Sequence, residues 1–199
     1  MYTLLFLVFA CSDKDDSDTA SLYEDTAIDD SEGDPLESDP WGDFEIDADM
    51  TIDATNSVEW VYFNMATAEV VSPDSPDDSE EWDLKFQRYE IGVNGGVSGT
   101  AGTMVLAEEG VYDAFDELEA APEGEWITDS EDADGDDKPE YALQDWFNYD
   151  ISTHVLTPKD VVYFIQTPAQ TYKFRIVDYY GPNGESGFMS FDFAPVNEE

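Results

Sequence analysis

An alternating stretch of the chain, followed directly by a run of glycines, constrains the fold most strongly. Within residues 81–87 the apolar side chains Trp82, Leu84 and Phe86 alternate with polar ones. A period of two places the two sets on opposite faces of an extended strand, so the pattern predicts a half-buried β-strand. Five glycines follow within residues 92–102, and glycine permits the positive φ angles and close backbone approaches of tight turns. The sequence therefore predicts an amphipathic strand that enters a tightly folded loop.

Several further segments have strand character. Residues 161–165 form a continuous apolar run, typical of a strand inside a sheet, and residues 171–180 alternate. Residues 182–184, Pro-Asn-Gly, are a strong turn signal before the closing strand at 188–193. Only residues 113–120 have helix character. We therefore predict an all-β, antiparallel, sandwich-like domain with at most one short helix, whose last three strands form a meander. Other short strands are expected at residues 58–65 and 69–71, and residues 103–106 are a brief apolar run.

The N-terminal residues 1–11, MYTLLFLVFAC, have the character of a signal peptide. The apolar run is far shorter than the roughly 20 residues that span a bilayer. Val-Phe-Ala-Cys at its end resembles the bacterial lipobox, in which the cysteine becomes the lipidated first residue, so we predict lipid attachment at Cys11. Ser12 at the next position favours the outer membrane. No Lys or Arg precedes Cys11, so either the start lies upstream or the signal is atypical.

Residues 12–49 form a separate, strongly acidic segment. They contain 16 acids and one base, Lys14, with many Ser, Thr, Gly and Pro residues. Low hydrophobicity with charge of one sign predicts a disordered, self-repelling segment. As a flexible coil it would span about 35 Å. We interpret it as a tether between the lipid anchor and a domain at residues 50–199.

The charge of the whole chain limits its partners. The sequence holds 49 acids and 7 bases, a formal net charge of −42. Nucleic acids and anionic membrane surfaces bind through Lys and Arg, so neither is an expected partner. Solubility is the favoured explanation of the charge, and cation binding is the alternative.

The inventory of reactive side chains argues against catalysis. Cys11 is the only cysteine and His154 the only histidine. An intrachain disulfide, a Cys/His zinc site and a Cys–His dyad are therefore excluded. The sequence has no Gly-x-Ser-x-Gly elbow, and its glycine run lacks the Gly-Lys-Ser/Thr ending of a P-loop. We therefore predict that the protein is not an enzyme.

Several segments together resemble the HmuY family over residues 50–195. They are residues 51–54 (Thr-Ile-Asp-Ala), 60–63 (Trp-Val-Tyr-Phe), 69–71, 82–89, 94–99, Trp146, 156–164, 178–180 and 187–188. The resemblance implies an all-β surface lipoprotein. The best-known members of the family capture haem and pass it to a TonB-dependent outer-membrane receptor.

The resemblance also implies where a ligand would bind. Haem-binding members hold the iron between two axial side chains, usually His or Met, and the corresponding positions here fall near Asp136 and Ile151. Neither residue is a good haem ligand. His154 lies three residues after Ile151 and is one candidate ligand, although a packed, hydrogen-bonded turn residue is the favoured interpretation. Met104 is a second candidate, although a Met in an apolar strand is usually part of the core.

An acidic loop offers a different kind of site. Asp132, Asp134 and Asp136 alternate around Gly135, and calcium binds oxygen ligands from such loops. The EF-hand pattern would require a Glu where Leu143 stands, so the motif is partial. Calcium binding is one interpretation of this loop, and a solvated acidic loop is the other.

Two functions follow from these observations. The first is a lipid-anchored surface protein that captures haem or a related ligand for uptake at the outer membrane. The second is a surface structural or interaction module without haem ligands, which calcium would stabilise. The family resemblance favours the first function, and the missing ligand residues favour the second.

Overall fold

The computed structural model describes residues 48–197, which form β-strands and two short 3-10 helices. The strands are β1 (Met50–Asp53), β2 (Val61–Asn64), β3 (Glu69–Val71), β4 (Leu84–Gln87), β5 (Glu90–Val93), β6 (Met104–Glu109), β7 (Phe147–Asp150), β8 (Val155–Pro158), β9 (Val161–Gln166), β10 (Thr171–Tyr180) and β11 (Ser186–Pro195). The 3-10 helices are η1 (Pro76–Asp78) and η2 (Tyr112–Glu117). Within residues 48–197, no helix has the length and apolar character needed to cross a membrane. The predicted signal, Cys11 and nearly all of the tether lie outside the described residues.

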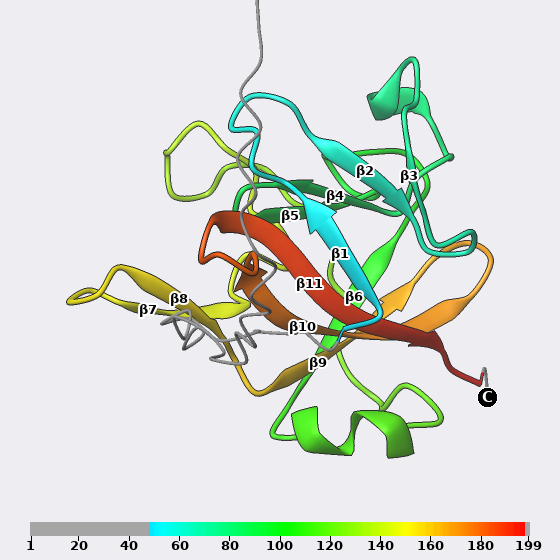
Figure 1. Cartoon of the computed structure of the whole chain (residues 1–199). Helices are drawn as coiled ribbons and strands as arrows, with labels where there is room; N and C mark the ends of the chain where they lie inside the picture. Colours follow the sequence, from blue (N-terminus) through cyan, green and yellow to red (C-terminus); the bar gives the residue numbers. More distant parts are fainter. Residues whose placement is uncertain (1–47, 198–199) are drawn as a thin grey trace, which may run out of the picture. The chain divides into compact units, whose positions relative to one another are not determined.

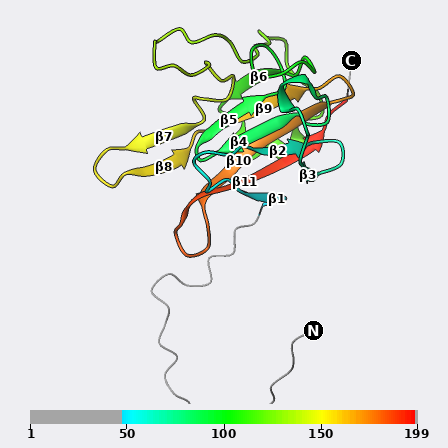
Figure 2. The same cartoon turned by 90° about the horizontal axis from the view of Figure 1, so that it is seen from above.

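The strands form two sheets and a separate hairpin (Figures 1 and 2). One sheet has five strands in the order β1-β11-β10-β9-β6, and the other has four in the order β3-β2-β4-β5. The hairpin consists of β7 and β8. Every pairing between these strands is antiparallel, and β9, β10 and β11 form the predicted meander. The all-β prediction is confirmed.

Aromatic side chains join the two sheets across a common core. Phe86 of β4 stacks on Phe191 of β11 with ring centroids 5.6 Å apart, and Phe63 of β2 meets the same ring edge-on at 5.5 Å. Each side chain of this size contributes about 2–3 kcal/mol when it leaves water. Trp82, Leu84 and Phe86 all have exposed fractions of 0%. The alternation at residues 81–87 therefore identified the buried face of β4, although the strand begins only at Leu84 and Asp83 of the predicted polar face is also buried.

Strand β9 is covered on both faces, which explains its continuous apolar sequence. Its odd-numbered residues contribute to the core between the sheets. Val162 and Phe164 belong to a second buried cluster, where Phe115 of η2 covers the outer face of the five-stranded sheet. An apolar run without alternation is the pattern of a strand buried on both sides.

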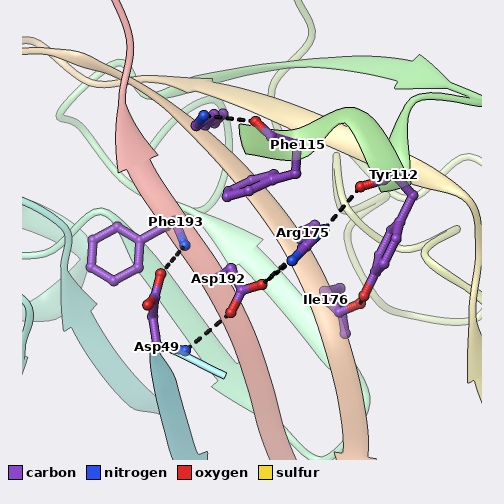
Figure 3. A network of polar contacts seen from close by, with 8 residues as sticks. Asp49, Tyr112, Phe115, Arg175, Ile176, Asp192 and Phe193 are labelled. Atoms are coloured by element: carbon purple, nitrogen blue, oxygen red, sulfur yellow. Dashed lines mark hydrogen bonds and ion pairs between the residues drawn. The ribbon is translucent and has the colours of Figure 1, made fainter. Parts of the chain in front are cut away.

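The segment predicted as a helix, residues 113–120, is the shorter 3-10 helix η2. Cationic side chains of β10 donate hydrogen bonds to backbone carbonyls of η2 (Figure 3). Lys173 Nζ donates to Phe115 O at 2.6 Å, and Arg175 Nη1 donates to Tyr112 O at 2.9 Å. The Phe115 carbonyl also accepts from the Leu118 N–H at 3.3 Å, so it serves both the 3-10 turn and the lysine. The contacts with β10 hold one short, tight turn against the sheet.

A network of polar contacts fixes the point where the chain enters the domain (Figure 3). The Asp192 carboxylate accepts from Arg175 Nε at 2.8 Å and from the Asp49 backbone N–H at 3.0 Å. The Asp49 carboxylate in turn accepts from the Phe193 N–H at 3.3 Å. The Arg175 guanidinium also lies 4.6 Å from the Phe115 ring centroid. One ion pair therefore links β1, β10, β11 and η2.

Gly95, Gly96, Gly99 and Gly102 lie in a tight loop, as predicted, whereas Gly92, the first glycine of the run, belongs to the unpredicted strand β5. Gly96 has a φ of +59°, and a Cβ there would lie 1.8 Å from the carbonyl oxygen of Asp129. The Val97 N–H donates to that same oxygen at 3.1 Å. The glycines therefore allow this loop to pack against the segment around Asp129, which begins the acidic loop.

Candidate ligand-binding site

A cavity of about 150 Å³ lies between β5, the start of β7 and the acidic loop, which we define as residues 126–140. Aromatic residues and carboxylates make up most of its lining. The lining residues are Tyr89, Glu90, Asp134, Asp136, Lys138, Pro139, Glu140, Tyr141, Gln144 and Phe147.

The base of the acidic loop is rigidly held. Asp129 is 1% exposed, and its carboxylate accepts from the Val93 N–H at 3.0 Å and from the Ala142 N–H at 2.9 Å. Burial raises the pKa of Asp129, although these hydrogen bonds and the charge of Lys85 oppose the shift. Backbone hydrogen bonds between Ser130 and Glu140 then close the loop. The loop therefore leaves and rejoins the domain at fixed points beside the cavity.

One wall of the cavity is aromatic and continuous with the core. The Tyr89 and Phe147 rings meet edge-on at 5.9 Å, and Phe147 meets Trp146 at 5.0 Å. Trp146 is 1% exposed, and its indole N–H donates to the Tyr89 carbonyl at 2.8 Å. Because the indole is buried and hydrogen-bonded, it holds the two outer rings in position.

Tyr141 forms another part of the wall, in a strongly negative environment. Its ring packs edge-on against Trp60 at 5.6 Å, and the Lys85 ammonium lies 5.8 Å from its centroid. Burial is the largest cause that raises the pKa of Tyr141 to about 12, and nearby carboxylates, Glu90 first among them, add to the shift. At neutral pH this phenol is therefore protonated.

An ion pair crosses the cavity. The ammonium group of Lys138, in the acidic loop, donates a hydrogen bond to Glu90 Oε1 of β5. The Lys138 side chain is 48% exposed, whereas that of Glu90 is 14% exposed. The hydrogen bond to Glu90 is the main cause that raises the pKa of Lys138. The pair joins the tip of the acidic loop to the four-stranded sheet.

The residues at the positions implied by the resemblance lie in different surroundings. Asp136 lines the cavity, whereas Ile151 is 80% exposed in the turn of the β7–β8 hairpin. His154 lies in the same turn, with a φ of +60° and a hydrogen bond between its Nδ1 and the Tyr149 hydroxyl. The expected turn and hydrogen bond are present, but His154 is exposed rather than packed. Among residues 48–197, β7 and β8 form a sheet of their own, and residues 150–155 of the turn are exposed.

The structure does not bring His154 and Met104 together. Met104 is half-buried at the first position of β6, where it pairs with Gln166. The hairpin leads into β9 at Val161, which pairs with Glu109 at the other end of β6. The length of β6, about 17 Å, therefore separates Met104 from the base of the hairpin. Two axial ligands must both reach one iron, and this pair lies too far apart.

The three aspartates of the acidic loop do come together. Carboxylate oxygens of Asp132, Asp134 and Asp136 all lie within 4.8 Å of one another, and the three side chains are exposed. Calcium binds oxygens at 2.3–2.6 Å, so one ion can reach oxygens at this spacing. The same carboxylates also order the loop, since Asp132 Oδ1 accepts from the Gly135 N–H at 2.6 Å.

The fold and the cavity define an antiparallel β-sandwich with a small site beside a lateral hairpin. The chain belongs to the HmuY family, because the family model described as HmuY protein matches residues 56–193. Comparison with curated proteins gave no match.

Solved structures have the same fold. A candidate HmuY-like haem-binding protein from Bacteroides vulgatus is 26% identical, with a TM-score of 0.54, over 72% of this chain and 88% of that one. The apo HmuY analogue of Tannerella forsythia is 16% identical, with a TM-score of 0.59, over 75% and 95%. A candidate lipoprotein from Bacteroides fragilis is 23% identical, with a TM-score of 0.55, over 75% and 91%.

The side chains at the site do not fit haem held between two axial ligands. Asp136 and Ile151 offer neither imidazole nor thioether. The cavity, about 150 Å³, is smaller than the roughly 300–1,000 Å³ of typical ligand pockets. Phenolate can bind haem iron, but burial and nearby carboxylates raise the pKa of Tyr141 to about 12, which makes its phenolate harder to form. The carboxylates of the lining would also repel haem propionates.

Sequence reasoning missed most of the cavity. It did not single out Tyr89, Glu90, Lys138, Tyr141 or Phe147. The aromatic density of residues 141–149 and a lone base within an acidic loop were the available signals. Glu90 and Lys138 are 48 residues apart, so only the folded chain shows that they pair.

Proposed function

We propose that this chain is a surface-exposed HmuY-type binding protein, anchored to the outer membrane through a lipid on Cys11, that captures a ligand at the cavity. It binds its ligand rather than transforming it. Membership of the HmuY family supports a binding role, and the likeness to a candidate lipoprotein supports the anchor. The acidic segment before residue 50 would hold the domain away from the membrane.

The position of the cavity carries this proposal. Asp136, at one of the two ligand positions that the resemblance implies, lines the cavity. The other position, Ile151, belongs to the hairpin whose strand β7 begins with Phe147, a second lining residue. A small site therefore exists where relatives are expected to hold a ligand, although the side chains around it differ.

Haem or a related ligand is the cargo that family membership favours, and a TonB-dependent receptor would then receive it. Two side chains of this region are candidates for iron ligation: His154 and Tyr89. Of these, His154 is an imidazole on an exposed hairpin turn, and Tyr89 is a phenol that is 45% exposed. Each of them would act alone, as a single axial ligand.

Haemin titration of the full-length protein tests this cargo, with His154→Ala and Tyr89→Phe alongside. A saturable, sharp Soret band that one substitution shifts would support haem capture and identify the ligand. Met104→Leu serves as a matched control, because Met104 lies at the far end of β6 from the hairpin. If no saturable band appears at micromolar haemin, haem is not the cargo, and the cavity would serve another ligand.

The second candidate function is a surface interaction module that calcium stabilises. The convergence of Asp132, Asp134 and Asp136 favours it. Calorimetric titration with calcium should then show one site, which Asp134→Asn weakens and Asp145→Asn, an exposed aspartate outside the loop, leaves unchanged. Heat changes without saturation, equal in both variants, would argue for a solvated acidic loop.

A further inference from the structure

The cavity has a marked excess of negative charge. Four carboxylates line it, those of Glu90, Asp134, Asp136 and Glu140, whereas Lys138 is the only base in the lining. Clefts lined by charge of one sign concentrate ions of the opposite sign. The side chains of the cavity therefore favour a cationic ligand.

The other bases of the domain are engaged elsewhere. Of the seven bases in the chain, only Lys14 precedes residue 48. Within residues 48–197, Arg88 donates to Ser186, Lys159 pairs with Asp145, and Arg175 pairs with Asp192. Lys173 donates to carbonyls of η2, and Lys85 lies among aromatic rings. In the described part of the chain, Lys138 is the only base in the lining of the cavity, and the Lys85 ammonium lies 5.8 Å from the Tyr141 ring.

Lys138 shows that the cavity accommodates an ammonium group. Its side chain reaches from the exposed tip of the acidic loop to Glu90, a carboxylate that is largely shielded from solvent. The next residue toward the loop tip, Asp137, has a φ of +66°, so the loop turns sharply just before Lys138. An ion pair with a half-exposed lysine contributes about 0–1 kcal/mol, so the lysine can leave at low cost.

Aromatic side chains around the cavity suit the same chemistry. Tyr89, Tyr141 and Phe147 line it, and ammonium groups bind favourably over such ring faces. The neighbouring Lys85 gives an example within this protein, because its ammonium lies 4.8 Å from the Trp60 ring and 5.8 Å from the Tyr141 ring. Tyr141 therefore belongs both to the cavity and to an existing cation–aromatic contact.

We infer that the cavity is a binding site for a primary ammonium group on a short alkyl stem, and that Lys138, which lines the cavity and pairs with Glu90, competes with the ligand for that carboxylate. This inference rests on the proposed capture function and names its ligand class. Glu90 would hold the ammonium, the aromatic wall would contact the stem, and the carboxylates of Asp134 and Asp136 would add charge. The volume of about 150 Å³ suits such a small group.

The test uses n-butylammonium chloride, which reproduces the lysine side chain without its backbone. Binding to the full-length protein is followed by chemical shifts in amide NMR spectra at constant ionic strength, with EDTA present. We expect saturable binding in the millimolar range, as befits so few atoms. Lys138→Met should tighten it about two- to sixfold, because the ligand then no longer competes with an ion pair of about 0–1 kcal/mol.

Two further variants distinguish binding at the cavity from a general effect of the protein's negative charge. In the Lys138→Met variant, the second substitution Glu90→Gln should abolish the gain in affinity for butylammonium. Lys159→Met removes the same charge from a pair outside the cavity lining and should leave the affinity within about twofold of the original protein. The inference would be overturned if Lys159→Met raised the affinity for butylammonium as much as Lys138→Met does. It would also be overturned if the Lys138→Met variant showed no saturable binding.

The ammonium group could come from a free amine or from a lysine of a partner protein. Titration with N-acetyl-lysine methylamide distinguishes the two, because only a site open enough for backbone would bind it as tightly as butylammonium. The haemin titration is independent of this experiment. Haem binding without amine binding would overturn the inference and leave the proposed capture function standing.

Discussion

Two ion pairs in this domain look alike in isolation and lie in very different regions. Arg175 and Asp192 have side chains that are 22% and 11% exposed, and their pair joins η2, two strands and the entry of the chain. Lys138 and Glu90 are 48% and 14% exposed, and their pair connects one loop tip to one strand. The side chains of the first pair also form hydrogen bonds with backbone groups, namely the Asp49 N–H and the Tyr112 carbonyl. The side chains of the second pair bond to each other.

The comparison shows how an acidic protein uses scarce bases. A base that also donates to buried carbonyls cannot leave without exposing unsatisfied groups, and this makes its removal costly. A base whose partner is a single carboxylate near solvent can exchange with another cation. The region around η2 is therefore a structural support, and the acidic loop is the part of the domain where contacts can change.

The largest expected effect comes from the rigid base of the acidic loop. Gly96→Ala should lower the free energy of unfolding by more than about 3 kcal/mol, because alanine is strained at positive φ and its Cβ would collide with the Asp129 carbonyl. Urea denaturation measures this loss. Gly102→Ala, also at positive φ but with no atom within 4 Å of the new Cβ, should cost clearly less. Equal losses would mean that backbone strain alone matters.

The support around η2 should show the next largest effect. Arg175→Met removes the ion pair and the hydrogen bond to the Tyr112 carbonyl, and we expect a loss of about 2 kcal/mol in the same measurement. The matched substitution Lys159→Met affects a pair whose Asp145 side chain is 89% exposed, and should cost less than about 0.5 kcal/mol. A similar cost for both substitutions would remove the distinction between structural and exposed pairs.

The buried carboxyl at the base of the loop should make stability depend on pH. Burial raises the pKa of Asp129 above its ordinary value of 3.8, so the folded protein binds this proton more tightly than the unfolded chain. Its contribution to stability is therefore complete below pH 3.8 and is lost as the pH rises through the raised folded value. Unfolding free energies of the original protein and Asp129→Asn, measured between pH 4 and pH 7, should differ increasingly in favour of the original protein toward low pH. A constant difference would contradict this expectation.

The smallest expected effect is on the exchangeable pair itself. Lys138→Met should change the free energy of unfolding by no more than about 0.5 kcal/mol, because half-exposed ion pairs contribute little. Thermal unfolding with and without salt measures it. A loss similar to that of Arg175→Met would mean that Lys138 supports the fold, and that its exchange with a ligand is too costly.

The sequence predicted those parts of the fold that depend on local pattern. The alternation around Leu84 predicted a strand with one buried face, and the apolar run at Val161–Ile165 predicted a strand inside a sheet. Both predictions were possible because the spacing of apolar residues along one strand shows which of its faces are buried. Residues 113–120 were predicted as a helix, whereas the chain forms the shorter 3-10 helix η2, whose carbonyls accept hydrogen bonds from Lys173 and Arg175 of β10. Local propensity cannot show these contacts, because they form only in the folded chain.

The site was less predictable, for a related physical reason. Asp136 was identified because the aspartates alternate within one short loop. Tyr89 lies in the turn between β4 and β5, and Glu90 is the first residue of β5. Only the contact of Trp146 with Tyr89 brings them beside Phe147. A cavity assembled from segments about 50 residues apart has no local signature.

The hydrogen bonds that join Asp49 to Asp192 and Phe193 of β11 have a mechanical consequence. Any pull along the chain from its N-terminal side reaches the fold at Asp49 and β1, whose four residues all pair antiparallel with β11. Force directed along β1 loads these pairs in shear, so that they must fail together rather than one after another. Strand β11 has ten residues and is joined to β10 along its other edge, which spreads the load into the core of the sandwich. The domain is thus attached to its N-terminal segment in a geometry suited to withstand drag.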